Sequence, residues 1–132
     1  MTSQPQPAVR CISAVTLATT DMARAVAFYK KLDFVVRYGG EHASFTSFHV
    51  GPGYLNLTTE APDHRPAFWG RVTFYVDEVD AMYARAIDQA LQPDTSPADA
   101  SWGERYFHIT DPDGHQLSFA KPIEGSRRST TR

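Results

Sequence analysis

Residues 102–117 have the sequence Trp-Gly-Glu-Arg-Tyr-Phe-His-Ile-Thr-Asp-Pro-Asp-Gly-His-Gln-Leu. The central Asp-Pro-Asp-Gly is typical of a tight turn, because proline presets one backbone angle and glycine accommodates a positive φ. Apolar and polar residues alternate on both sides of the turn, which is the pattern of half-buried strands. The stretch therefore predicts a hairpin whose strands cover Arg105–Thr110 and Gln116–Lys121.

The residues before this hairpin predict a strand and a helix. Arg71–Val76 has the composition of a strand, and acidic residues at 77, 78 and 80 then mark a helix start, where the helix dipole favours negative charge. Apolar residues recur at helical spacing from Val79 to Ala90, and we expect Pro93 to end the helix. A weaker extended segment, Asp94–Ser96, is expected to form a short strand.

The same order of elements occurs once more, nearer the N-terminus. A strand over Ile12–Leu17 is followed by an N-cap at residues 20–21 and by apolar residues at helical spacing. Three further strands are expected over Phe34–Tyr38, Ser44–Val50 and Tyr54–Thr59. The repeat predicts an α+β fold of two tandem βαβββ modules forming a curved sheet, with the helices on one face and a ligand groove on the other.

The length and composition fit one globular domain. The chain has 132 residues, of which 42% are hydrophobic. We expect a single domain over residues 10–122, with module one at 10–60 and module two at 69–122. Residues 1–9 and 123–132 are polar or proline-rich and are expected to be disordered.

Charge and patterning bear on partners and location. Thirteen basic and fifteen acidic residues give a formal charge of −2, which does not favour a nucleic-acid partner. We see neither an apolar run near the ~20 residues that cross a bilayer nor a basic-then-apolar signal pattern, so we expect no membrane partner and a cytoplasmic location. The single cysteine, Cys11, lies in an apolar run and is expected to be a packed thiol.

Three strings in this chain resemble the glyoxalase/bleomycin resistance protein/dioxygenase superfamily, also called the vicinal oxygen chelate superfamily. They begin at Val15, Arg71 and Trp102, and they follow the superfamily's order on the expected strand, helix and hairpin. The similarity covers roughly residues 10–121 and implies the superfamily's two-module fold. The last string is especially similar to the bleomycin-resistance branch.

The resemblance also locates the metal site of metal-dependent members, which chelate through four groove-facing side chains, usually His or Glu. The matching positions here hold Ala14, Asn56, Arg71 and Ser118. Alanine has no donor atom, arginine is permanently cationic, and neutral Asn and Ser oxygens are weak ligands. We therefore expect no metal and no other cofactor, and neither glyoxalase I chemistry, extradiol dioxygenation nor metal-dependent fosfomycin modification.

Strand alternation predicts which side chains line the groove instead. The predicted ligand-binding residues are Tyr54, Asn56, Trp69, Arg71, Thr73, Tyr75, Trp102, Tyr106, His108 and Ser118. They combine flat aromatic walls, one fixed cation and several neutral hydrogen-bonding groups. Such a groove suits a planar or amphipathic organic ligand with an acidic or carbonyl group.

Several of these residues have structural alternatives. Arg71 could pair with a carboxylate such as Glu104 across a dimer contact, and Trp102 could be a packing residue at a strand entry. His108 could act as a general base, because its ordinary pKa lies near neutrality, or could be only a neutral hydrogen-bonded residue. A metal site formed by His49 and His108 in place of the superfamily's usual ligands is a further alternative.

The resemblance implies a metal-independent binding protein of the bleomycin-resistance type. Such a protein is a homodimer that sequesters an antibiotic or an aromatic metabolite in grooves at the dimer interface. The alternative is a metal-independent enzyme of isomerase or lyase type, with His108 or Tyr106 as acid or base and Arg71 stabilising an oxyanion. A third hypothesis is an interaction module without a ligand.

Overall fold

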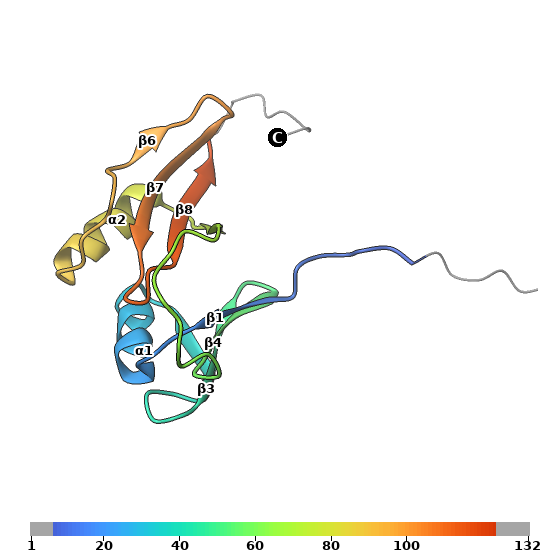
Figure 1. The fold of residues 1–132 in the computed structure, drawn as a ribbon. Coiled ribbons are helices and arrows are strands. Elements are labelled where there is room, and N and C mark those ends of the chain that lie inside the picture. Colours follow the sequence, from blue (N-terminus) through green and yellow to red (C-terminus); the bar gives the residue numbers. More distant parts are fainter. Residues whose placement is uncertain (1–6, 124–132) are drawn as a thin grey trace, which may run out of the picture.

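The computed structural model describes residues 7–123, and Figure 1 shows two modules of the same construction. Module one contains β1 (Ala14–Ala18), α1 (Met22–Lys31), β2 (Val35–Tyr38), β3 (Phe45–Val50) and β4 (Gly53–Thr58). Module two contains β5 (Arg71–Tyr75), α2 (Val79–Asp88), β6 (Ala98–Asp99), β7 (Glu104–Thr110) and β8 (Gln116–Pro122). The predicted disorder concerns mostly residues outside the described range, while residues 7–9 are exposed and form neither helix nor strand.

The two tandem βαβββ modules of the α+β prediction are confirmed, and each forms its own four-stranded sheet. The strand orders are β1-β4-β3-β2 and β5-β8-β7-β6, so both modules have the same topology. In each sheet the first strand pairs in parallel with the last one, and the remaining pairs are antiparallel. As a result β1 and β5 are both edge strands. Both helices lie on one side of the strands (Figure 1), which leaves the other sheet face of each module uncovered by helix.

The repeat extends to the helix ends. Asp21 caps α1 by accepting a hydrogen bond from the backbone of Arg24, as predicted. Each helix then ends in a left-handed residue, Asp33 with φ 67° and Ala90 with φ 62°, and a backbone N–H just beyond returns to a carbonyl five residues earlier. The expectation that Pro93 ends α2 was therefore wrong, because this turn ends the helix several residues before the proline.

The short strand before β7 also differs from the prediction. It was expected at residues 94–96 and instead covers Ala98–Asp99. The predicted segment does lie along β7, but Thr95 contacts the strand partly through its hydroxyl, which accepts from the backbone N–H of His108 at 3.0 Å. Pro93 and Pro97 flank the segment and cannot donate a backbone hydrogen bond, so a regular ladder does not form there.

A shared aromatic core joins the two modules. The ring of Phe34, which follows α1, lies 5.1 Å from that of Phe74 on β5 and 6.2 Å from that of Phe119 on β8. On the other side Phe34 meets Tyr29 at 5.2 Å and Phe48 at 6.0 Å, mostly edge to face. The modules of one chain therefore bury their apolar faces against each other.

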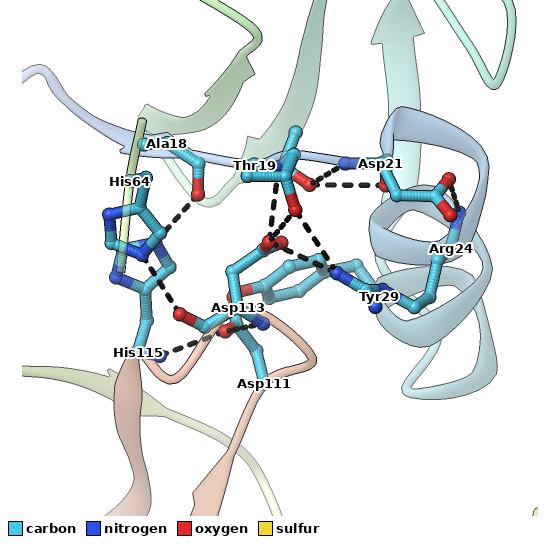
Figure 2. A network of polar contacts seen from close by, with 10 residues as sticks. Ala18, Thr19, Asp21, Arg24, Tyr29, His64, Asp111, Asp113 and His115 are labelled. Atoms are coloured by element: carbon cyan, nitrogen blue, oxygen red, sulfur yellow. Dashed lines mark hydrogen bonds and ion pairs between the residues drawn. The ribbon is translucent and has the colours of Figure 1, made fainter. Parts of the chain in front are cut away.

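A buried network of hydrogen bonds connects the hairpin turn of module two to module one (Figure 2). The carboxylate of Asp111 accepts hydrogen bonds from the Tyr29 hydroxyl at 2.6 Å and from the backbone N–H groups of Asp113 and His115 at 2.9 Å each. Asp113 in turn accepts from the Arg24 guanidinium at 3.2 Å. The turn that decides the hairpin is thus also a connector between the modules.

Two smaller observations concern Cys11 and membranes. The expectation of a packed thiol was wrong: Cys11 is exposed, because β1 begins only at Ala14 and the residues before it do not enter the core. Within residues 7–123, neither helix has the length and apolar character needed to cross a membrane.

Candidate functional site

A cavity of about 410 Å³ lies between the modules, where the edge strands β1 and β5 face each other. Module one contributes Tyr54 and apolar residues of β1, β3 and β4, and module two contributes Trp69 and β5. Its volume is in the range of small-molecule sites in proteins, which is roughly 300–1,000 Å³. The lining is mainly apolar, with Arg71 and Thr73 as polar groups on one wall.

Arg71 places a positive charge at this cavity. It begins β5 and is exposed, and its guanidinium carbon lies 5.8 Å from the centre of the Phe68 ring. Module one adds a second cation that sequence reasoning missed: the Arg37 guanidinium lies 4.1 Å from the centre of the Tyr54 ring and contacts the Ser47 hydroxyl at 3.3 Å. Arginines stacked on rings remain available to carboxylates through their edges.

The uncovered sheet face of module two carries a connected row of aromatic and polar side chains. Thr73, Ser118 and His108 lie side by side across β5, β8 and β7. The ring of Tyr106 lies 4.9 Å from that of His108 and 6.1 Å from that of Trp102, nearly parallel to the latter. This row adjoins the cavity through Thr73.

Glu104 is the residue at this face that the prediction did not place. Its side chain is only 2% exposed, and it accepts hydrogen bonds from the Trp102 indole N–H at 2.9 Å and from the Tyr75 hydroxyl. A carboxylate removed from water needs such donors. The two donors lie on the same sheet face as Glu104. The pairing of Glu104 with Arg71 across a dimer contact stays a prediction.

Both tryptophans have their single hydrogen-bond donor engaged inside the protein. Trp69 donates to His115 at 2.8 Å and Trp102 to Glu104 at 2.9 Å. Their side chains nevertheless remain 52% and 45% exposed. Since the polar edge of each indole is held, the ring surface is what each presents to solvent.

His108, also on this face, has a shifted pKa. Burial lowers its pKa below 6.5, the nearby Arg71 charge lowers it further, and Asp94 acts in the opposite direction. Its Nδ1 atom is buried and makes no hydrogen bond within the described part of the chain. A lowered pKa keeps the imidazole neutral near pH 7.

We expect an NMR pH titration to give His108 a pKa below 6.5. Replacing Arg71 with methionine should raise this pKa while leaving it below the ordinary value, because burial is the larger cause. Since the folded-state pKa is lowered, the contribution of His108 to stability is present above pH ~6.5 and is lost as the pH falls through the folded value. An unchanged pKa in Arg71→Met would show that the two groups do not interact.

Comparisons with known proteins agree on the architecture. The model of the Glyoxalase/Bleomycin resistance protein/Dioxygenase superfamily matches residues 12–119. The chain belongs to this superfamily. A glyoxalase/bleomycin resistance protein/dioxygenase from Nocardioides superposes with a TM-score of 0.74 and 21% identity, over 95% of this chain and 91% of that one.

A bleomycin-binding protein and a mycobacterial protein are also similar to this chain. A bleomycin-binding protein solved in complex with bleomycin superposes with a TM-score of 0.68 and 22% identity, over 86% of this chain and 98% of that one. At such identities the likeness concerns the fold alone. A curated relative, an uncharacterized protein of Mycobacterium bovis, is 38% identical over 48 residues, which make up 36% of this chain and 32% of that protein.

The residues at the superfamily's metal-ligand positions do not fit a metal ion. Ala14 lies on β1 without a donor atom, and Arg71 brings a positive charge to β5. The Asn56 amide contacts the Thr16 hydroxyl at 3.3 Å, and Ser118 is a buried neutral hydroxyl. Residues 7–123 contain no group of three or more His, Cys, Asp or Glu placed to hold a metal.

The structure divides the ten predicted ligand-binding residues into two sets. Tyr54, Trp69, Arg71 and Thr73 line the cavity between the modules. The module-two face carries Tyr75, Trp102, Tyr106, His108 and Ser118. Asn56 lies two residues from Tyr54 on the same face of β4. The ligand roles of all ten remain predictions.

Proposed function

We propose that this superfamily member binds a planar organic molecule, an antibiotic or an aromatic metabolite, and sequesters it without a metal ion. The observation that carries the proposal is the pair of half-exposed tryptophans whose indole N–H groups are engaged internally. Rings held in place before binding lose little conformational freedom when a ligand stacks on them. A comparable structure was solved with bleomycin bound, which supports a small-molecule role for this fold.

Charge gives the ligand its expected polarity. Arg71 at the cavity and Arg37 on Tyr54 favour an acidic or carbonyl group on the ligand. The formal charge of −2 is small for a protein that would hold a strongly cationic drug. An aromatic acid is therefore a better first probe than a cationic glycopeptide.

Tryptophan fluorescence tests the proposal directly, because the chain has two tryptophans and the proposal gives both a ligand contact, Trp69 at the cavity and Trp102 on the module-two face. We expect 2-naphthoate or an aromatic antibiotic to quench the emission saturably, at one ligand per site, with metal-free protein and without conversion of the ligand. Metal analysis of the purified protein and chromatography of the recovered ligand are the controls. Stoichiometric metal, or a ligand recovered as a different compound, would contradict the sequestering function.

A homodimer is part of the proposal. Exposed apolar side chains of Ile12 and Phe68 lie beside the cavity or next to its lining, and the edges of β1 and β5 are unpaired within the described residues. A second copy would cover these surfaces and complete the groove. Sedimentation of a ~15 kDa species at micromolar concentration would contradict the shared groove.

One observation favours a second candidate, a metal-independent enzyme with acid–base chemistry. His108 has a lowered pKa, so its imidazole is neutral near pH 7 as a general base must be, and Arg71 and Tyr106 are its neighbours. Turnover of a candidate substrate that is lost in His108→Ala, with ligand affinity retained, would favour the enzyme over the binding protein.

A further inference from the structure

His115, immediately after the Asp-Pro-Asp-Gly turn, is buried at a point where three segments meet. Its side chain is 3% exposed. Its Nδ1 accepts the indole N–H of Trp69 at 2.8 Å, and its Nε2 donates to the carbonyl of Ala18 at 2.7 Å. One imidazole therefore joins the linker between the modules (residues 59–70) to the end of β1.

These two contacts determine which nitrogen of His115 carries the proton. A carbonyl oxygen only accepts, so Nε2 must be the protonated nitrogen, and an indole N–H only donates, so Nδ1 must be bare. The arrangement thus requires one tautomer of the neutral ring. An amide side chain could reproduce it, with the oxygen facing Trp69 and the NH₂ facing Ala18, whereas an apolar side chain could not.

The rest of the linker is held against the same turn. The His64 ring stacks on the His115 ring with 4.9 Å between centroids, and its Nε2 donates to the carbonyl of Asp113 at 2.9 Å (Figure 2). Gly114, at φ 87°, leaves room for Pro66, since an added Cβ would lie 2.5 Å from the proline side chain. The linker's position at this end therefore depends on the turn, and Trp69 is its last side chain before Arg71.

We propose that His115 is the positioning residue for Trp69: it holds the indole by its N–H, so that the ring forms a fixed wall of the inter-module cavity. Trp69 is half exposed and lines this cavity, while its donor is unavailable to a ligand. The Trp69 ring therefore favours ligands with a flat surface that can stack on it. Its N–H does not bind a hydrogen-bond acceptor on the ligand, because His115 already accepts it. This inference rests on the proposed function only for the statement that the wall contacts a ligand.

The test uses the full chain labelled with ¹⁵N, in which two tryptophans give two indole N–H signals. The Trp69 and Trp102 signals are assigned from Trp69→Phe and Trp102→Phe. In His115→Leu we expect the Trp69 signal to shift and the exchange of its N–H proton with solvent to become at least about tenfold faster. In His115→Gln we expect the Trp69 signal to stay near its wild-type position. The Trp102 signal is the internal control for folding, and His42→Gln, at an exposed loop histidine, is the matched histidine control.

Affinity for 2-naphthoate, measured by isothermal titration calorimetry, separates positioning from general damage. We expect His115→Leu to weaken binding about tenfold in the wild-type background and to have almost no effect in the Trp69→Phe background, because phenylalanine has no N–H for His115 to hold. Equal losses in both backgrounds, or an unmoved Trp69 signal in His115→Leu, would overturn the proposal. If the wild type bound no probe, the proposed function would fail while the NMR signals still decided the positioning role.

Discussion

Replacing Asp111 with alanine is expected to lower the free energy of unfolding by about 3–5 kcal/mol, a large share of the ~5–15 kcal/mol of a typical domain. The carboxylate is 4% exposed and accepts three hydrogen bonds, from the Tyr29 hydroxyl and from the backbones of Asp113 and His115. Alanine would leave these three donors without an acceptor in the interior and would remove the hydrogen bond between the hairpin turn and Tyr29 of α1. Urea unfolding at neutral pH, followed by circular dichroism, measures the loss.

Asp111→Asn should cost much less than Asp111→Ala, because the amide oxygen can still accept from the backbone. Burial raises the pKa of Asp111, so the charge itself is not favoured at this place. Asp99→Ala, at an exposed carboxylate that pairs with Arg105, serves as the surface control, with an expected change below about 1 kcal/mol. Equal effects of the three substitutions would show that the network contributes nothing specific.

The partner of Asp111 adds a dependence on alkaline pH. Burial raises the pKa of Tyr29 well above 10, and the charge of Asp111 and its hydrogen bond raise it further. Because the folded-state pKa is above the unfolded one, the contribution of Tyr29 is fully present below pH ~10 and is lost as the pH rises towards the folded value. Wild-type stability should therefore fall above pH ~10, and Tyr29→Phe should reduce this fall.

Local patterns were sufficient to predict most elements, because caps, tight turns and apolar periodicity involve residues that are close in the sequence. The cap at Asp21 and the hairpin around residues 111–114 are examples, since their hydrogen bonds lie within a few residues. The position of the short strand β6 was predicted incorrectly. Its segment has few apolar residues, and the prolines decide where a ladder of backbone hydrogen bonds can form. The alternation of apolar and polar residues does not reveal this.

The site was harder to predict because its decisive contacts join distant residues. Alternation correctly put Arg71 and Thr73 on the face away from the core, but it could not show that Trp69 reaches a histidine 46 residues away. Glu104 is a second residue whose environment could not be predicted from the sequence. Its period along β7 puts it on the face of Tyr106, yet only the fold reveals that it is buried there beneath two aromatic donors.

The pseudo-repeat was informative about topology and not about chemistry. Equivalent positions of the two modules hold different side chains: Asn56 on β4 corresponds to Ser118 on β8, and Ser47 on β3 to His108 on β7. Repeated backbone geometry constrains where a side chain points, while each module is free to vary what it presents. The row of Trp102, Tyr106 and His108 on module two therefore has no copy of the same composition on module one.

Replacing Arg71 with methionine is expected to weaken the binding of 2-naphthoate by about 10- to 100-fold, the equivalent of one charge-assisted hydrogen-bonded contact in a partly desolvated site. Arg71 lies on the cavity wall at the start of β5, and methionine keeps much of its apolar stem while removing the charge. Arg71→Lys should give an intermediate affinity, because the ammonium keeps the charge without the planar fork that engages both carboxylate oxygens.

A neutral probe of the same shape, 2-naphthalenemethanol, provides the control for Arg71. If the guanidinium binds the acid, Arg71→Met should leave the affinity for this alcohol within about twofold, since stacking on the Trp69 ring at the cavity does not require the charge. Equal losses for acid and alcohol would mean that Arg71 supports the shape of the cavity and does not contact the ligand. Loss of the acid alone, with the His108 pKa raised in the same variant, would place cation, histidine and ligand at one site, because both effects arise from the same positive charge.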